Sequence, residues 1–249
     1  MAVFTVFFAG VCSGVLAQTA AQEPPPLWDA QVGASFVGTS GNSDTSSAGA
    51  DFAAHRRGVV WQVESAATAV RTTSDGTKTA ERYVGHVRGH RELSAILGVT
   101  SGAELERDEF SGIAFRSTLD AGLSWRLVRG TAWTLDGVTA LSWNHLHSDV
   151  AVPDRNDPGA VLQLLSRIPF GAAGDTTQRF TLFPDLKDGS QMRSEAEVTV
   201  QAVMSSHLAL KLGYLLRHAD TPVAGFKKTD GTTTASVVLR WKASAPAAR

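Results

Sequence analysis

Cysteine is almost absent from this sequence. Cys12 is the only cysteine among 249 residues, and it lies in an apolar amino-terminal segment that we expect to be removed from the mature chain. A mature chain without cysteine can form no disulfide bond and offers no thiolate site for a metal or for redox chemistry. Val11 stands before Cys12 where a lipoprotein signal has a small residue, so we expect no lipid anchor.

The sequence also lacks long apolar runs and a surplus of one charge. Beyond the amino-terminal segment no window reaches about 18 consecutive apolar residues, so the mature chain contains no candidate for a membrane-spanning helix. The formal net charge is -1 at pH 7, and the charged residues are scattered singly. Without a run of basic residues to neutralise a row of phosphates, nucleic acid is excluded as an expected partner.

Residues 1–22 have the composition of a secretory signal peptide. They carry no charged side chain, are mostly apolar, and end in small residues suited to cleavage near Ala17, Ala20 or Ala21. A buried or membrane-anchoring helix is the alternative, although about 17 apolar-leaning residues are short for a spanning helix. Residues 23–249 have an even composition, which predicts a single domain.

Apolar and polar residues alternate along most of the mature chain. In the run from Ile113 to Leu127, for example, apolar side chains share one face, and Arg116, Asp120 and Arg126 share the other. Such a period of two predicts half-buried β-strands. We predict twelve strands, at about 28–39, 45–56, 58–72, 77–92, 95–108, 112–127, 131–147, 158–169, 176–184, 190–205, 206–219 and 229–242. The run AVLQLLSRI (160–168) is continuously apolar; its context favours a strand, and a short helix is the alternative.

The connections between these strands alternate in length. The stretch GTSGNSDTSSAGADF (38–52) contains a knot of Gly, Asn and Asp that is suited to a hairpin tip. The connections at 56–58, 92–95, 128–130 and 205–207 are tight, and those at 149–159 and 219–230 are long. In an up-and-down meander the long connections all fall at one end. That asymmetry, with both termini at the other end, is typical of outer-membrane β-barrels, whose periplasmic turns are short.

Tryptophan positions agree with this topology. Aromatic side chains gather at the two interfaces of a membrane because their rings favour the boundary between hydrocarbon and water. Five of the six tryptophans map to the expected periplasmic rim, and only Trp143 maps to the outer rim. The five are Trp28, Trp61, Trp125, Trp133 and Trp241.

The faces opposite the apolar ones carry charges of both signs. In a dry core each ion would cost several kcal/mol unless paired, whereas a wet or ion-paired barrel lumen accommodates them. We therefore predict a polar lumen, crossed by ion pairs, largely occluded, and with weak preference for anions or cations. The predicted inward charges are Glu64, Arg82, His86, Arg88, Glu104, Glu106, Arg116, Asp120, Arg126, Glu195, Glu197, Lys211 and Arg217.

Four blocks occur in order along the chain: GTSGNSDTSS, TAERYVGHVR (79–88), ELERDEFSGIAFRSTLDAGLSWRL (104–127) and GFKKTDGTTTASVVLRW (225–241). Together they resemble the YdiY-like family of salt-induced outer-membrane proteins, also defined as domain of unknown function 481. The resemblance implies an outer-membrane barrel with no established reaction and no catalytic residues to carry over. Family members end on an aromatic residue that resembles an assembly signal, whereas here Trp241 is followed by KASAPAAR.

Three groups of residues are candidate sites. The knot WNHLHSD (143–149) places His145 and His147 near Ser148, but on a strand the histidines project to one side and the serine to the other, which favours polar residues at the rim over a catalytic set. His86 and His90 share a face with arginines that would repel a metal ion. The loop DRNDPG (154–159) has a proline at a ligand position of a calcium loop, so we predict a solvated turn.

These observations predict a non-enzymatic, monomeric outer-membrane β-barrel without catalytic residues, metal or cofactor and with no assigned ligand site. Its expected partners are outer-membrane lipids and, during biogenesis, the assembly machinery and periplasmic chaperones. A role in salt, osmotic or envelope stress is implied by the family resemblance alone. The alternatives are a small-solute or ion channel, a soluble periplasmic lipid-binding β-barrel, and an enzyme that modifies envelope lipids.

Overall fold

The computed structural model describes residues 27–39, 45–58, 60–149, 153–189 and 191–243. These residues form twelve β-strands and two short 3-10 helices. The strands are β1 (Trp28–Thr39), β2 (Thr45–Arg57), β3 (Gln62–Ser74), β4 (Thr77–Glu92), β5 (Leu97–Asp108), β6 (Ile113–Arg129), β7 (Thr134–Ser148), β8 (Arg155–Pro169), β9 (Gly174–Pro184), β10 (Met192–Val203), β11 (Leu208–Ala219) and β12 (Thr229–Ala243), and the helices are η1 (Glu109–Ser111) and η2 (Gly171–Ala173). No helix in the described ranges is long and apolar enough to cross a membrane.

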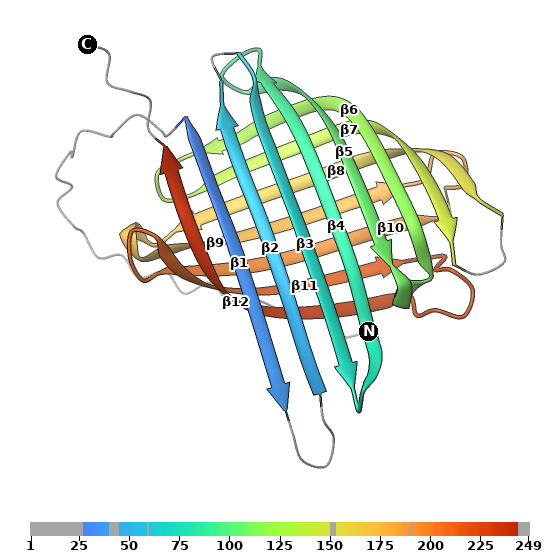
Figure 1. Ribbon diagram of the computed structural model, residues 1–249. Helices are drawn as coiled ribbons and strands as arrows, with labels where there is room; N and C mark the ends of the chain where they lie inside the picture. Colours follow the sequence, from blue (N-terminus) through green and yellow to red (C-terminus); the bar gives the residue numbers. More distant parts are fainter. Residues whose placement is uncertain (1–26, 40–44, 59, 150–152, 190, 244–249) are drawn as a thin grey trace, which may run out of the picture.

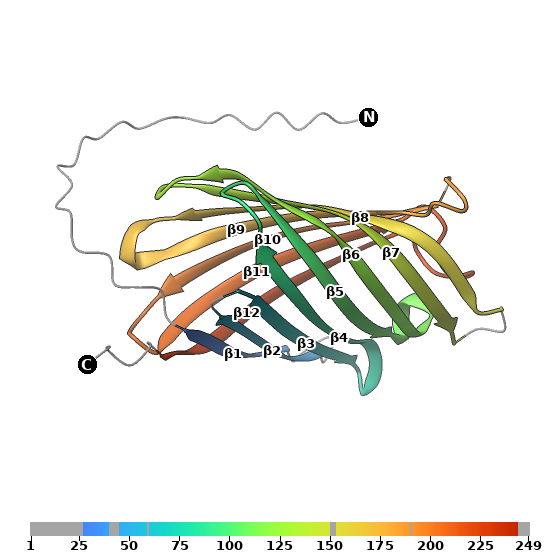
Figure 2. The ribbon, with the colours of Figure 1, turned by 90° about the horizontal axis from the view of Figure 1, so that it is seen from above.

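Each strand pairs antiparallel with its neighbours in the sequence, and β1 pairs with β12 from Trp28↔Ala243 to Ala34↔Val237, which closes the sheet. The fold is therefore an all-β, antiparallel up-and-down barrel of twelve strands, as predicted. The strands of the wall formed by β1–β4 cross those of the wall formed by β8–β11 at a steep angle (Figure 1), and the view from above shows the same crossing (Figure 2). Strong tilt relative to the barrel axis is what closure of a sheet requires.

The two ends of the barrel differ in their connections. At one end, which we call the turn end, the connections are 58–61, 93–96, 130–133, 170–173 and 204–207, each of four residues. At the other, the loop end, they range from two residues at 75–76 to nine at 220–228. β1 starts and β12 stops at the turn end. The predicted asymmetry of the connections is thus confirmed.

The outer face of the barrel is apolar. Phe36 is 73% exposed, Leu141 70% and Leu212 60%, although all three lie well inside their strands. Only five apolar residues of the described chain are fully buried, and two of them are alanines. A protein folded in water buries such side chains and rarely exposes a contiguous apolar patch above a few hundred Å². The distribution is that of a sheet whose apolar face is directed away from the protein.

The tryptophans lie where they were expected. Trp28 opens β1, Trp61 and Trp133 each directly precede a strand at the turn end, and Trp241 lies two residues before the end of β12. Trp143 faces outward on β7 toward the loop end and is 52% exposed. One rim of the barrel is therefore rich in indole rings.

Strand limits agree with the prediction to within a few residues, and the AVLQLLSRI run is part of β8. The hairpin predicted around 38–52 is confirmed by the pairing Thr39↔Thr45; residues 40–44 of its tip lie outside the described residues. The proposed signal peptide with Cys12, and residues 244–249, lie outside them as well.

One local prediction was wrong. The segment 154–159 is not a turn, because β8 begins at Arg155 and Pro158 pairs with Trp143 of β7. The Pro158 carbonyl accepts a hydrogen bond from the Leu186 N–H. The N–H and C=O groups of one strand residue point to the same side, so the proline nitrogen also faces β9. The β8–β9 ladder begins only at Leu162, so no ladder hydrogen bond requires an N–H group at Pro158. A proline that need not donate is tolerated in a strand.

Candidate functional site

The inner wall of the barrel carries a cluster of four arginines and four carboxylates, which we call the lumen cluster. Its members are Arg82 (β4), Glu104, Glu106 and Asp108 (β5), Arg116 (β6), Arg193 and Glu195 (β10), and Arg217 (β11). Strand geometry places them, because every second residue of a strand points to the same face. The three acids of β5 therefore form one inward row.

Glu106 is the centre of the lumen cluster. Its side chain is 1% exposed, and both carboxylate oxygens are bound by guanidinium groups. Arg82 and Arg217 donate to Oε1 at 2.9 Å and 3.1 Å, and Arg116 and Arg193 lie 2.9 Å and 3.5 Å from Oε2. One buried carboxylate thus contacts four guanidinium groups. Its single negative charge balances one of them, so the three other acids of the lumen cluster are needed to balance the other three.

These contacts connect opposite walls of the barrel. β5 and β11 are six strands apart in a ring of twelve, yet Arg217 binds both Glu106 and, at 2.8 Å, Asp108. Arg193 of β10 reaches the same wall and also lies 3.3 Å from Glu195 on its own strand. Its guanidinium carbon lies 3.8 Å from the ring centroid of Phe183, which fixes its position further. The predicted pairing of inward charges across the barrel is therefore present.

A second pair lies nearer the turn end. Arg88 of β4 donates two hydrogen bonds to Asp120 of β6, at 2.8 Å and 2.7 Å. The pair crosses over Gly102 of β5, where a Cβ atom would lie 2.7 Å from the Arg88 guanidinium and 2.8 Å from the Asp120 carboxylate. Glycine at this position lets two charged side chains meet across the strand between them.

Further charged groups line the wall along the β1–β4 side. Glu64 lies 3.2 Å from His55 and 3.6 Å from His86, and His55 lies 3.4 Å from Asp29. Toward β11, Asp51 is 3.3 Å from the ammonium group of Lys211. Most of the lumen charge is thus locally paired.

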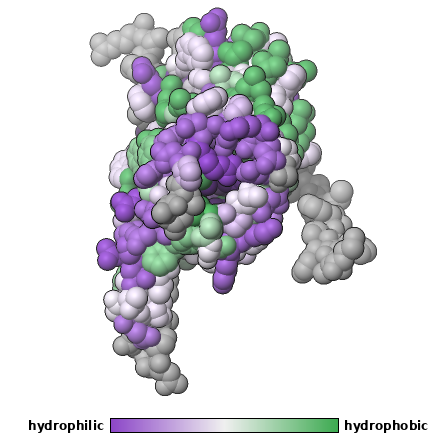
Figure 3. All heavy atoms as spheres, turned by 90° about the vertical axis from the view of Figure 1, so that its right-hand side faces the viewer, coloured by the Kyte–Doolittle hydropathy of each residue, from purple (hydrophilic) through white to green (hydrophobic). Residues whose placement is uncertain are grey.

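Three cavities follow the barrel axis. The loop end opens into a cavity of about 510 Å³ whose lining includes Arg116, Arg193 and Arg217 of the lumen cluster. A small cavity of about 90 Å³ contains Glu64, His86 and Asp120, and one of about 210 Å³ lies at the turn end. Seen along the barrel, the loop end has a ring of hydrophilic residues around a hollow (Figure 3). Charged and apolar side chains together line the cavities at both ends, and the lumen cluster borders the cavity at the loop end.

The knot at 143–149 does not assemble a catalytic set. The Ser148 hydroxyl is buried and donates to the Gly112 carbonyl at 2.9 Å. His145 bonds Asn156 and His147 bonds Asp154, at 2.9 Å and 2.6 Å, on the outer side of the rim. The histidines and the serine point to opposite faces, as the strand reading predicted.

The two histidines weighed as metal ligands also have other partners. His86 pairs with Glu64, and His90 Nδ1 lies 2.9 Å from the Ser124 hydroxyl. Across the described ranges no group of three or more His, Cys, Asp or Glu side chains is arranged to hold a metal ion.

Sequence reasoning missed several charged members of the inner wall, among them Asp51, Asp108 and Arg193. Asp108 and Arg193 each lie two residues from a residue that was predicted to face inward, and Asp51 lies in a run whose alternation was recognised. The period of two could therefore have identified all three. Arg193 has the same parity as Glu195 and Glu197, and Asp108 has that of Glu106.

The model of a protein family of unknown function, DUF481, matches residues 32–241. The chain belongs to the DUF481 family. The resemblance to this family is thereby confirmed, while the salt-induced description remains a prediction. No curated protein matches this DUF481 member in sequence.

Solved structures similar to this DUF481 member are distant. The NanC porin is 14% identical with a TM-score of 0.47, and covers 86% of this chain and 97% of its own. An outer membrane channel from Pseudomonas putida F1 is 12% identical with a TM-score of 0.49, covering 88% and 95%. The translocator domain of the autotransporter NalP from Neisseria meningitidis is 9% identical with a TM-score of 0.45, covering 89% and 90%. At this distance no activity is transferred from them.

Proposed function

We propose that this protein is a non-enzymatic outer-membrane β-barrel whose lumen cluster closes the passage to general solutes. The observation that carries the proposal is the contact of Arg193 and Arg217 with Glu106 on the opposite wall. Side chains that meet across the lumen occupy the space through which a solute would pass. The near balance of charge in the lumen cluster also favours a weak preference between anions and cations.

Residence in the outer membrane is supported by the chain's own surface. Apolar side chains on the outer face and tryptophans at the rims match the surface of a transmembrane barrel, whose apolar band is about 25 Å tall. We expect the protein to stay in washed membranes after carbonate or high-salt treatment and to change its gel mobility on boiling. Release without detergent, or unchanged mobility, would favour the soluble lipid-binding barrel instead.

Closure of the lumen is tested by planar-bilayer recording. A twelve-stranded barrel is wider than the eight-stranded kind that side chains fill and narrower than the porins that hold a water-filled channel, so width alone does not decide. We expect no stable conductance comparable to that of a general porin. Such a conductance, or strong selectivity that survives Arg116→Ala and Arg126→Ala, would contradict the proposal.

A small-solute channel is the second candidate. The cavities of about 510 Å³ and 210 Å³ open toward the two ends of the barrel and support it, since only the interior side chains lie between them. This candidate predicts small, brief conductance steps and slow uptake of small solutes into liposomes. The closed barrel predicts neither.

We further propose that the protein acts as a monomer without enzymatic activity and contributes to tolerance of salt or envelope stress. The opposite faces of Ser148 and the histidines of the same strand support the lack of enzymatic activity, and family resemblance supports the stress role. Growth of a deletion strain at high salt tests the stress role. Lipid turnover by the purified protein that disappears on His145→Ala would favour an envelope lipid-modifying enzyme.

A further inference from the structure

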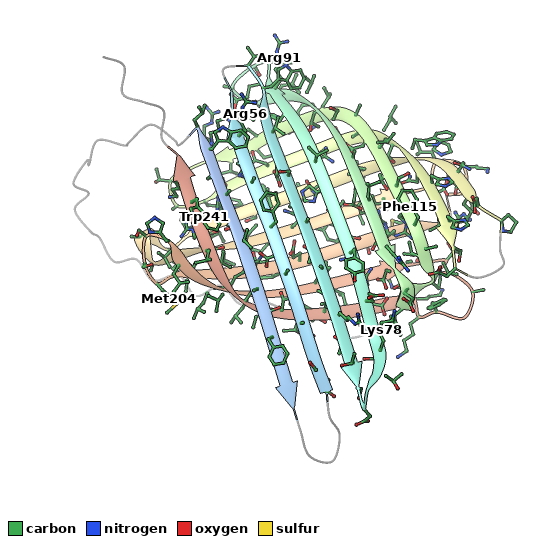
Figure 4. All side chains as sticks on the ribbon, viewed as in Figure 1. Arg56, Lys78, Arg91, Phe115, Met204 and Trp241 are labelled. Atoms are coloured by element: carbon green, nitrogen blue, oxygen red, sulfur yellow. The ribbon has the colours of Figure 1, made fainter. Side chains whose placement is uncertain are left out.

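Two arginines lie on the outer face of the barrel at the turn end. Arg56 and Arg91 are the penultimate residues of β2 and β4. Both are exposed, and each shares the alternation of an outward apolar residue on its strand, Phe52 on β2 and Val87 on β4. Figure 4 shows Arg56 and Arg91 at the same end of the barrel.

The acidic side chains at this end point inward and are already paired. Their ion pairs are Asp29 with Arg57 at 3.0 Å, Glu92 and Asp136 with Arg126 at 2.8 Å and 3.6 Å, and Asp175 with Arg167 at 3.0 Å. By contrast, Arg56 and Arg91 form no ion pair with any side chain in the described part of the chain. The outer face of the turn end therefore carries uncompensated positive charge.

Indole rings lie beside these arginines. The Arg56 guanidinium lies over the Trp28 ring, 5.3 Å from its centroid. The Trp61 ring covers the outer side of β4, because a Cβ atom on Gly89 would lie 3.9 Å from it. Indole rings favour the depth of lipid headgroups, and guanidinium groups bind phosphate oxygens through two parallel hydrogen bonds. The rim thus combines indole rings, which favour the headgroup depth, with guanidinium groups that can bind phosphate.

The outer face of the loop end is different. There Lys78 lies 2.7 Å from Glu81 and 2.6 Å from Glu109, and Arg71 lies 3.9 Å from Glu81. Figure 4 shows Lys78 at the end opposite to Arg56. Arg71 and Lys78 at this rim thus have acidic partners among the described residues, which Arg56 and Arg91 lack.

We propose that Arg56 and Arg91, with the flanking tryptophans, form a docking surface for the phosphate groups of anionic phospholipids in the leaflet at the turn end. The inference rests on the proposed membrane residence. Because β3 lies between the strands of the two arginines, they are roughly 10 Å apart across the strands, so each binds a separate headgroup. A zwitterionic headgroup brings its own cation and leaves the surplus charge unbalanced, which is why anionic headgroups are preferred.

The test compares quenching of tryptophan fluorescence by brominated phosphatidylglycerol and brominated phosphatidylcholine in mixed vesicles. Five of the six tryptophans belong to the turn end, so the signal reports that rim. We expect wild-type protein to prefer phosphatidylglycerol by roughly tenfold, since each basic residue near an anionic surface contributes a several-fold factor. The variant Arg56→Gln/Arg91→Gln is expected to lose this preference.

The matched control changes outward charges at the loop end, Arg71→Gln/Arg107→Gln, and is expected to keep the preference. Equal quenching by both lipids in the wild type, or equal loss of preference in both variants, would overturn the inference. Flotation of the same vesicles separates the two proposals. Protein that floats with the vesicles without headgroup preference contradicts only the docking surface, whereas wild-type protein that does not float contradicts membrane residence as well.

Discussion

Glu106 is the residue on which the interior of this barrel depends. A carboxylate that is 1% exposed loses its hydration, and the loss is offset only by the guanidinium groups around it. Those groups in turn need the carboxylate, because four arginines brought together without it would repel one another. The arginines and the carboxylates of the lumen cluster therefore stabilise one another, and loss of the central carboxylate has the largest effect on stability.

Glu106→Gln is expected to destabilise the barrel by about 3–5 kcal/mol, the usual cost of leaving buried charges without their partner. The measurement is the urea midpoint of unfolding in lipid or detergent, followed by the loss of the compact gel form. The control is Glu197→Gln, which removes an inward carboxylate of β10 that lies 3.5 Å from Arg179. Both of those side chains are about one-third exposed, so that change costs at most about 1 kcal/mol. Equal shifts would mean that Glu106 has no special role.

Sequence predicted the inward direction of Glu106, Arg116 and Arg217 because side-chain direction follows from a period of two. It could not predict that these residues meet. Contacts between strands six positions apart in the ring depend on the stagger of all strands between them, and that stagger depends on bulges such as the one between Glu106 and Asp108. The alternating pattern therefore predicts which face of the barrel wall each side chain occupies, but not which side chain it contacts.

At the scale of elements, twelve alternating runs became twelve strands because one face of each run is apolar throughout. The errors fall at strand ends, where the pattern weakens. The polar segment 154–159 was predicted as a turn since Asn, Asp, Pro and Gly are turn formers, and nothing in it indicates that β7 offers residues 155–159 a partner. Pairing with a neighbouring strand outweighs local preference there.

The pairing of β6 with β7 is close at Gly122. A Cβ atom at this position would overlap the Thr139 carbonyl and the Cα atom of Ala140, so the two strands would have to separate. Gly122→Ala is therefore expected to destabilise the barrel by roughly 1–3 kcal/mol, as other forced insertions do. Gly85→Ala is the matched control, because the nearest atom to its Cβ would be the Ala66 carbonyl oxygen at 4.0 Å. The urea midpoint of both variants measures the difference, and a midpoint unchanged by Gly122→Ala would show that the strands can part freely.

The outer face of β7 offers a test of membrane depth. Leu141 lies at the middle of the strand and is 70% exposed, and His147 lies near its end at the loop-end rim. Leu141→Arg is expected to cost about 2–4 kcal/mol in a bilayer, and His147→Arg about 0–1 kcal/mol, because the penalty for a cation is greatest at the midplane. Unfolding from vesicles of defined lipid measures both. Equal costs at the two positions would contradict an embedded outer face.

At the scale of the whole molecule, the apolar exterior, the charged interior and the closure by β1 and β12 depend on one another. The alternating pattern places charge inside as a consequence of placing apolar groups outside, and a closed ring of strands then faces those charges toward one another. Function depends on whether the charges leave room between them. Contacts along one wall narrow the lumen little, whereas contacts between opposite walls obstruct it.

The decisive variant removes one such contact without changing net charge. Asp108→Ala/Arg217→Ala deletes the pair that joins β5 to β11 at 2.8 Å and takes away one charge of each sign. We expect this variant to give conductance steps in planar bilayers that the wild type does not show, with weak selectivity because the balance of charge is preserved. Arg179→Ala/Glu197→Ala is the control, since it deletes an inward pair of the adjacent strands β9 and β10 that does not cross the lumen. If both variants conduct alike, or neither differs from the wild type, the contacts between opposite walls do not close the passage. In that case the obstruction must be sought in the loop-end cavity above Arg116 and Arg193.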